Sequence, residues 1–175
     1  MINGTNGAGK TTLSRLIVGL IEPSRGQILA DGLDLRQVHP EWWRKQVMYM
    51  PQEPGFLNAT LEENITINAP DTDISQLNQI IDASDLRQFL DEAPNGFETP
   101  IIDNGRKLAV GIRRRLALAR ALTTNGKLLV FDEPTEGIQP SIIKLITSVI
   151  KSLRDQGNMA IILVEQYFEF AFELA

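Results

Sequence analysis

Residues 4–11 constrain the fold of this chain more than any other segment, because they read Gly-Thr-Asn-Gly-Ala-Gly-Lys-Thr. They fit the pattern G-x-x-x-x-G-K-[ST], in which glycines let backbone N–H groups converge on phosphate oxygens. A helix that opens directly after such a loop adds the positive end of its dipole. The alternative interpretation is a glycine-rich turn before a helix. The pattern favours a phosphate-binding loop that takes ATP.

Several side chains of this segment have predictable roles. Lys10 is expected to reach the β- and γ-phosphates and to act in catalysis, and the Thr11 hydroxyl is expected to ligate Mg²⁺, which prefers oxygen ligands. The predicted cofactors are therefore ATP and Mg²⁺. The residues of this loop that we expect to bind the nucleotide are Gly4, Asn6, Gly7, Ala8, Gly9, Lys10, Thr11 and Thr12.

A second motif is the apolar run 128–131, which ends in two adjacent acids, Asp132 and Glu133. Neighbouring strand residues point to opposite faces, so the two carboxylates are expected to have different roles. Asp132 suits the magnesium shell and Glu133 suits the attacking water, since phosphoryl transfer needs charge neutralisation and a positioned nucleophile. A solvated strand end is the alternative, but the two motifs in this order favour an ATP site.

The remaining pattern predicts an α/β fold. Strand, helix and strand in succession indicate a parallel sheet. Residues 57–122 read as helical segments and are predicted to form a subdomain inserted into a single domain over 1–175. The expected strands are 47–50, 127–131 and 159–164, and the expected helices are 11–20 and 142–153.

Composition limits the possible partners. At 175 residues, with 43% hydrophobic and 22% charged residues, the chain has the size and composition of one globular domain. Its net charge of −5 argues against a nucleic-acid partner. The absence of cysteine excludes disulfides and thiolate metal sites. The apolar runs are shorter than the roughly 20 residues of a membrane-spanning helix, so we expect no direct membrane insertion.

On these residues the chain resembles the ATP-binding cassette (ABC) ATPases, which are P-loop NTPases with a RecA-like parallel sheet and flanking helices. Residues 49–52, Tyr-Met-Pro-Gln, match the family's glutamine loop. The resemblance implies that Gln52 meets Mg²⁺ and the nucleotide, and that it reports nucleotide state to a membrane domain. Gln166 stands at the switch position, where a histidine is usual; glutamine can hydrogen-bond phosphate or water but cannot take up a proton at neutral pH.

The family's LSGGQ signature aligns with residues 108–112, which are Leu108, Ala109, Val110, Gly111 and Ile112. In the family this segment caps the γ-phosphate of ATP held by the opposite subunit. Ala109 lacks the hydroxyl, and a β-branched Val110 tolerates positive φ poorly. We therefore expect a weakened composite site. Arg113, Arg114 and Arg115 follow, either as substitutes for the lost phosphate contacts or, as we favour, as a solvated turn or partners of nearby acids.

Two subfamilies are represented along the chain. Residues 54–65 and 94–99 resemble exporters and type I secretion ATPases. Residues 133–143 and 163–166 resemble the ATPases of branched-chain amino acid and urea importers. The chain therefore reads as a mosaic. Family members have further strands before the phosphate loop and after the switch, so the domain is expected to be truncated at both ends.

The resemblance implies an ATP-hydrolysing subunit or domain of an ABC transporter. It would dimerise with a second nucleotide-binding domain and energise a membrane-spanning domain, as a peripheral component on the cytoplasmic side of the membrane. Three alternatives remain open: a nucleotide-binding module with little hydrolysis, suggested by Ala109, Val110, Ile112 and Gln166; a soluble cassette ATPase; and a truncated or chimeric cassette.

Overall fold

The computed structural model describes residues 1–5, 7–124, 126–135, 139–166 and 170. The strands are β1 (Ile2–Asn3), β2 (Leu29–Ala30), β3 (Leu33–Asp34), β4 (Val47–Met50), β5 (Leu128–Asp132) and β6 (Ala160–Glu165). The α-helices are α1 (Lys10–Ile17), α2 (Pro40–Gln46), α3 (Leu61–Thr66), α4 (Ile74–Ala83), α5 (Arg87–Glu92), α6 (Val110–Leu122) and α7 (Pro140–Gln156). Short 3₁₀ helices are η1 (Leu35–Gln37), η2 (Gly96–Glu98) and η3 (Asp103–Gly105).

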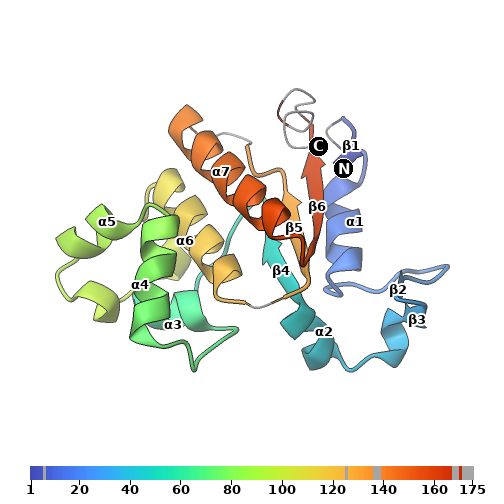
Figure 1. Ribbon diagram of the computed structural model, residues 1–175, viewed down its shortest axis with the longest axis horizontal. Coiled ribbons are helices and arrows are strands. Elements are labelled where there is room, and N and C mark those ends of the chain that lie inside the picture. The colour runs from blue at the N-terminus through green and yellow to red at the C-terminus, as the bar shows by residue number, and fades with distance from the viewer. Residues whose placement is uncertain (6, 125, 136–138, 167–169, 171–175) are drawn as a thin grey trace.

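A parallel sheet forms the centre of the molecule, with strand order β1-β6-β5-β4. Leu128 of β5 pairs with Val47 on one side and with Ala160 on the other. Parallel strands need crossover connections, which here run through helices. The α/β prediction is confirmed, and β2 and β3 form a separate antiparallel pair (Figure 1).

The two faces of the sheet are covered by different helices, because side chains alternate along each strand. Met50 and Phe131 pack with α6 and α7 in one core cluster. Val47 and Val130 pack with Val18, at the end of α1, in another. The result is three layers, with α1 on one side of the sheet and α6 and α7 on the other (Figure 1).

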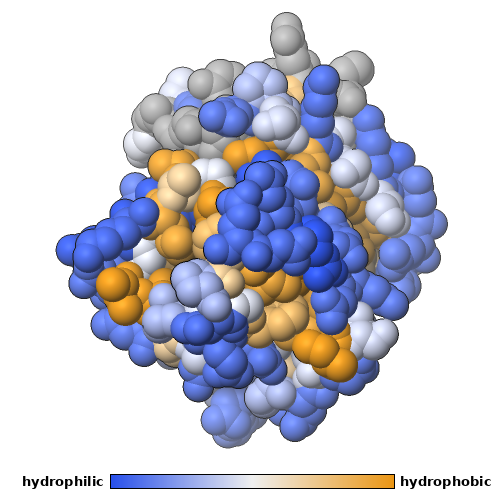
Figure 2. Space-filling view, turned by 90° about the vertical axis from the view of Figure 1, so that its left-hand side faces the viewer, coloured by the Kyte–Doolittle hydropathy of each residue, from blue (hydrophilic) through white to orange (hydrophobic). Residues whose placement is uncertain are grey.

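The helices between β4 and β5 have a core of their own, which includes Leu61, Leu77, Ile81, Leu86, Leu90 and Leu116. A capping box between Thr60 and Glu63 starts α3, and the Asp73 carboxylate caps α4. Seen from the side of these helices, the surface is mostly hydrophilic with hydrophobic patches between (Figure 2). That residues 57–122 are a separate subdomain stays a prediction.

Helix ends differ from the sequence prediction by a few residues. Helix α1 ends at Ile17 rather than at residue 20, because Gly19 adopts φ +75° and Leu20 N–H bonds to the Arg15 carbonyl at 2.8 Å. Helix α7 begins earlier than predicted, with Pro140 in its first turn, and ends before the left-handed Gly157. These shifts leave the order of elements unchanged.

Candidate nucleotide-binding site

The predicted phosphate loop connects β1 to α1. Gly7 and Gly9 have φ of +80° and +87°, a region that side chains strongly disfavour. Gly9 is also the N-cap residue of α1, whose first turn contains no acidic residue. The first N–H groups of a helix lack intrahelical partners, so this helix end can receive an anion. Asn6 lies outside the described residues, and Gly4 approaches Ala8 closely enough that a Cβ on Gly4 would lie 3.3 Å from the Ala8 Cβ.

Lys10 begins α1 and its side chain is buried. Its Nζ donates to the Thr5 carbonyl at 3.0 Å and lies 2.8 Å from Glu133 Oε1. An ammonium has three N–H donors. Among the residues that the structure describes, the third donor has no partner. Lys10 can therefore contact a phosphate oxygen without giving up either interaction.

Asp132 ends β5 and points to the α1 face of the sheet, as Val130 does two residues earlier. Its Oδ1 accepts from the Thr11 hydroxyl at 3.3 Å, and its Oδ2 accepts from the Tyr49 hydroxyl at 3.2 Å. Burial, and then the charge of Asp132, raise the pKa of Tyr49 well above its usual value. Tyr49 therefore remains a neutral donor. The Tyr49 hydroxyl was not predicted from the sequence, although strand alternation places Tyr49 on the α1 face.

Glu133 does not follow the alternation expected of a strand residue next to Asp132. The strand ends at Asp132, and Glu133 adopts φ +49°, a left-handed conformation that few residues other than glycine adopt. Its carboxylate therefore does not point to the opposite face. Instead Oε1 contacts Lys10, and Oε2 accepts from Gln52 Nε2 at 3.0 Å. Both carboxylates therefore contact the start of α1, Glu133 through Lys10 and Asp132 through Thr11.

A hollow of about 420 Å³ lies between these groups. It brings together three segments that are far apart in the sequence: the phosphate loop, the glutamine loop and the acidic strand end. The described residues that line it are Gly7, Gly9, Lys10, Thr11, Thr12, Gln52 and Glu133. The arrangement suits an anionic ligand with several oxygens, since backbone N–H groups, an ammonium and an amide face one space.

The oxygen donors of the site fit Mg²⁺. Thr11 and Asp132 lie within hydrogen-bond distance of each other, and Gln52 lines the same hollow. Among the described residues no group of three His, Cys, Asp or Glu side chains could hold a metal by itself. Mg²⁺ commonly takes one or two carboxylates and completes its shell with substrate phosphates and water. The donor set therefore fits Mg²⁺ that arrives with a nucleotide.

The signature residues 108–112 belong to a different part of the molecule. None of them is among the described residues that line the hollow. Ala109 is the N-cap residue of α6 and makes no side-chain hydrogen bond to the helix. Val110 is the first residue of α6, and its φ is not positive. Leu108 and Ile112 pack against the helical core. A Cβ on Gly111 would lie 2.9 Å from Ile142 Cδ1, so the glycine has a packing reason of its own.

The three arginines after the signature include two with partners inside the chain. Arg115 forms an ion pair with Asp85 at 2.8 Å, and the Arg114 guanidinium donates to the Pro51 carbonyl at 3.2 Å. The Arg115–Asp85 pair agrees with the expected pairing with nearby acids, whereas Arg114 is buried, so the expectation of a solvated turn does not hold for it. The Arg114 contact also connects the start of α6 to Pro51, the residue directly before Gln52.

Gln166 follows β6 and is half-buried. Its backbone N–H donates to Glu165 Oε1 at 2.8 Å, and Glu165 Oε2 accepts from the Thr135 hydroxyl at 2.7 Å. Glu165 and Thr135 were not predicted as site residues. The available signal was an acid at the end of an apolar strand, the same signal that identified Asp132.

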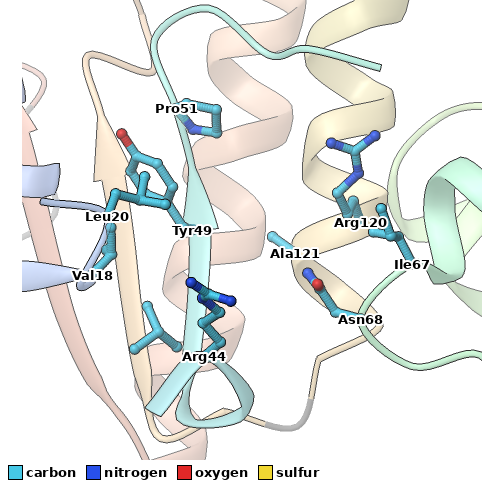
Figure 3. Close-up of a pocket in the computed structure, with 10 residues that line it drawn as sticks. Val18, Leu20, Arg44, Tyr49, Pro51, Ile67, Asn68, Arg120 and Ala121 are labelled. Atoms are coloured by element: carbon cyan, nitrogen blue, oxygen red, sulfur yellow. The ribbon is translucent and has the colours of Figure 1, made fainter. Parts of the chain in front are cut away.

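A second hollow, of about 270 Å³, forms a groove between the sheet and the helical segment. Figure 3 shows Tyr49 and Pro51 on one wall and Arg120 and Ala121 on the other. The remaining lining residues are Val18, Leu20, Arg44, Val47, Ile67 and Asn68. The floor is thus largely apolar, with a guanidinium at either side.

Arg120 is fixed in this groove wall. Its guanidinium donates to the Asn64 and Gly55 carbonyls at 2.8 and 2.9 Å, and lies 5.0 Å from the centroid of the Phe56 ring. Burial lowers the pKa of Arg120 from its ordinary value. Arg44, by contrast, has an exposed side chain without a hydrogen bond or ion pair to the described residues.

The chain is similar to a family of known proteins. The family model for "ABC transporter" matches residues 1–136. The alpha-hemolysin translocation ATP-binding protein HlyB of Escherichia coli O157:H7 is 38% identical over 137 residues, 78% of this chain and 19% of that protein. The beta-(1→2)glucan export ATP-binding/permease protein NdvA of Rhizobium meliloti is 33% identical over 161 residues, 92% of this chain and 28% of that protein.

A solved structure of a bacterial Atm1-family ABC exporter with ATP bound matches with a TM-score of 0.86 at 27% identity. The match covers 96% of this chain and 29% of the exporter chain. This chain therefore spans less than a third of each of these relatives. The relatives agree with the exporter-like segments, and the importer-like character of residues 133–143 and 163–166 stays a prediction. In the described part of the chain, no helix has the length and apolarity needed to cross a membrane.

Proposed function

The chain belongs to the ABC transporter ATPase family, where it corresponds to the nucleotide-binding domain of exporter-type transporters, and we propose that it binds Mg²⁺ and ATP in the hollow beside Lys10 and hydrolyses the nucleotide. The observation that carries this proposal is the convergence of Lys10, Gln52 and Glu133 around one space. The names of the relatives describe translocation and export proteins, which favours hydrolysis over a module that only binds nucleotide.

The contacts support a role for each of these residues. The N–H groups of the phosphate loop and the third donor of Lys10 hold phosphate oxygens. Thr11, Gln52 and Asp132 would hold Mg²⁺, which neutralises phosphate charge when bound. Glu133 accepts a proton from the attacking water, and Gln52 orients the Glu133 carboxylate through its hydrogen bond at 3.0 Å. Gln166 donates or accepts a hydrogen bond at the phosphate or the water.

Binding is tested by the melting temperature with and without Mg²⁺ and ATP, since a ligand that binds only the folded state raises it. We expect Lys10→Ala to remove the shift and Lys45→Ala, on an exposed part of α2, to keep it. Thr11→Val, which keeps the side-chain volume, should lose the part of the shift that depends on Mg²⁺. A Lys10→Ala variant that folds and keeps the full shift would contradict the proposal.

We propose further that a membrane-spanning domain docks in the groove of Figure 3, which would place the chain on the cytoplasmic side of a membrane as a peripheral component. The apolar floor suits a short helix, and Arg44, which has no partner among the described residues, suits an acidic group on that helix. One of the relatives is named an ATP-binding and permease protein, so its chain combines both parts.

The chain contains no cysteine, so single cysteines can report this contact. Ile67 lines the groove and Ile74 lies on α4, and both are exposed. When each variant is produced with the membrane-spanning domain of its transporter, Ile67→Cys should cross-link to that domain and Ile74→Cys should not. Equal cross-linking of the two, or none with either, would contradict docking in the groove.

A second nucleotide-binding domain is the other proposed partner. The signature residues lie outside the hollow of their own chain, so a signature contact with ATP would have to come from another copy or a homologous domain. Sedimentation of the Glu133→Gln variant with Mg²⁺ and ATP tests this association. A species of twice the monomer mass is expected with ATP and not without it.

A further inference from the structure

A buried carboxylate outside the proposed site lies at the end of β6. Glu165 has 0% of its surface exposed. Its Oε2 accepts from the Thr135 hydroxyl at 2.7 Å, and its Oε1 accepts from the Gln166 backbone N–H at 2.8 Å. Burial of a carboxylate is costly unless hydrogen bonds compensate for the lost water. The two donors come from two different segments, one after β5 and one after β6.

The first of these segments also contains Glu133. Thr135 lies two residues after Glu133, and Glu133 N–H donates to the Val164 carbonyl at 2.8 Å. The turn after β5 is thus tied to the end of β6 at two points, the Val164 carbonyl and the Glu165 carboxylate. Glu133 needs such support, because a left-handed conformation of a residue with a Cβ persists only where its surroundings determine it.

The second segment contains the switch residue. Because Glu165 accepts the backbone N–H of Gln166, the same carboxylate limits where the chain can go directly after β6. The segment that contains Glu133 and the segment that contains Gln166 are therefore both hydrogen-bonded to one buried carboxylate. Neither Thr135 nor Glu165 is among the described residues that line the nucleotide hollow.

We propose that Glu165 is a positioning residue, which sets the geometry of Glu133 through Thr135 and that of Gln166 through its backbone N–H. The catalytic consequence rests on the proposed role of Glu133 in hydrolysis. The structural part does not, since it concerns hydrogen bonds within the chain. A purely stabilising bond is the competing explanation, and it predicts a lower melting temperature without any specific effect on Glu133 or Gln166.

The first test uses Thr135→Val, which removes the hydroxyl at nearly constant volume, and Thr135→Ser, which keeps the hydroxyl. Thr147→Val is the control, because the Thr147 hydroxyl bonds to the Ile143 carbonyl within α7. Amide hydrogen exchange at Glu133 and Gln166, measured by NMR without nucleotide, should be about tenfold faster in Thr135→Val than in the wild type. Thr135→Ser and Thr147→Val should leave both rates near the wild-type values. Unchanged rates in Thr135→Val, or equal acceleration in Thr147→Val, would overturn the proposal.

The second test measures phosphate release. Thr135→Val should lower kcat roughly ten- to a hundredfold and leave KM for ATP unchanged, because a small displacement of a catalytic group slows the reaction without weakening binding. Thr135→Ser should restore kcat. A fall in kcat that Thr147→Val reproduces would overturn the proposal. If the wild type released no phosphate, the proposed hydrolysis would fail, and the exchange rates would still decide the role of Glu165.

Discussion

Lys10 Nζ lies 2.8 Å from Glu133 Oε1, and both side chains are 5% exposed. The two residues come from the start of α1 and the end of β5, which the parallel sheet brings together. An ion pair removed from water depends on both partners, since either charge alone is costly in the interior. The lysine proposed to bind phosphate and the proposed general base are thus linked energetically as well as in space.

A first prediction follows for folding stability. Lys10→Ala leaves the buried Glu133 carboxylate without its ammonium and should lower the free energy of unfolding by about 3–5 kcal/mol. Glu133→Gln leaves the Lys10 ammonium without its counter-charge, but should cost less, about 2–3 kcal/mol, because the amide oxygen and the Thr5 carbonyl still accept from Lys10. Urea denaturation measures both. The double variant Lys10→Met/Glu133→Gln should lose less than the sum of Lys10→Met and Glu133→Gln, and strict additivity would argue against the pair.

A second prediction concerns the phosphate loop. Gly9 has φ +87°, and a Cβ added there would meet no atom within 4 Å, so Gly9→Ala tests conformation rather than crowding. Gly9→Ala should lower the free energy of unfolding by roughly 1–2 kcal/mol, because alanine is disfavoured in the left-handed conformation. Gly55→Ala is the matched control, because a Cβ there also meets nothing within 4 Å and its φ is not positive. Equal effects of the two substitutions would contradict the loop geometry.

A third prediction concerns the signature. Ala109 caps α6 with φ −55° and ψ 145° and without a side-chain hydrogen bond. Ala109→Ser places a hydroxyl where it can accept from the first turn of α6, and should stabilise the fold by about 1 kcal/mol. The same hydroxyl restores part of the signature, so phosphate release should also rise. Stabilisation without faster phosphate release would support the capping of α6 and contradict a signature contact with ATP of a second subunit.

A fourth prediction concerns the groove wall. Arg120 joins α6 to residues 55–64 through three hydrogen bonds and the Phe56 ring. A lysine cannot reproduce this planar fork, so Arg120→Lys should lower the free energy of unfolding by about 2 kcal/mol. Arg25→Lys, at an exposed position, should change it by less than about 0.5 kcal/mol. Thermal or urea denaturation distinguishes the two results.

The sequence was informative where function depends on local pattern. Glycines at fixed spacing predicted the loop in which Gly7 and Gly9 adopt positive φ, and an apolar strand ending in Asp132 predicted the carboxylate that accepts from the Thr11 hydroxyl. The direction of Glu133 was predicted wrongly, because alternation holds only while the strand continues and Glu133 already lies in a turn. Tyr49 and Asp132 are 83 positions apart, and Thr135 and Glu165 are 30 apart. Such contacts depend on how the strands are ordered in the sheet, which local patterns do not specify.

The partners of the arginines after the signature illustrate the same limit. A run of three cations at a helix start is compatible with a phosphate or with acids nearby. The choice depends on α4 and α5 folding back on α6, which brings Asp85 to Arg115. Helix ends were predicted only approximately for a related reason, since a glycine such as Gly19 ends a helix only when its left-handed conformation is actually adopted.

Steady-state phosphate release by the wild-type chain and by Glu133→Gln, with Mg²⁺ and ATP, tests the proposed hydrolysis. We expect measurable release by the wild type and a fall of about 10²–10⁴-fold in the variant. Both proteins should show the same rise in melting temperature with Mg²⁺ and ATP, because Glu133→Gln keeps the phosphate loop, Thr11 and Asp132. Equal phosphate release by the two proteins would contradict the role of Glu133 and with it the proposed hydrolysis in this hollow.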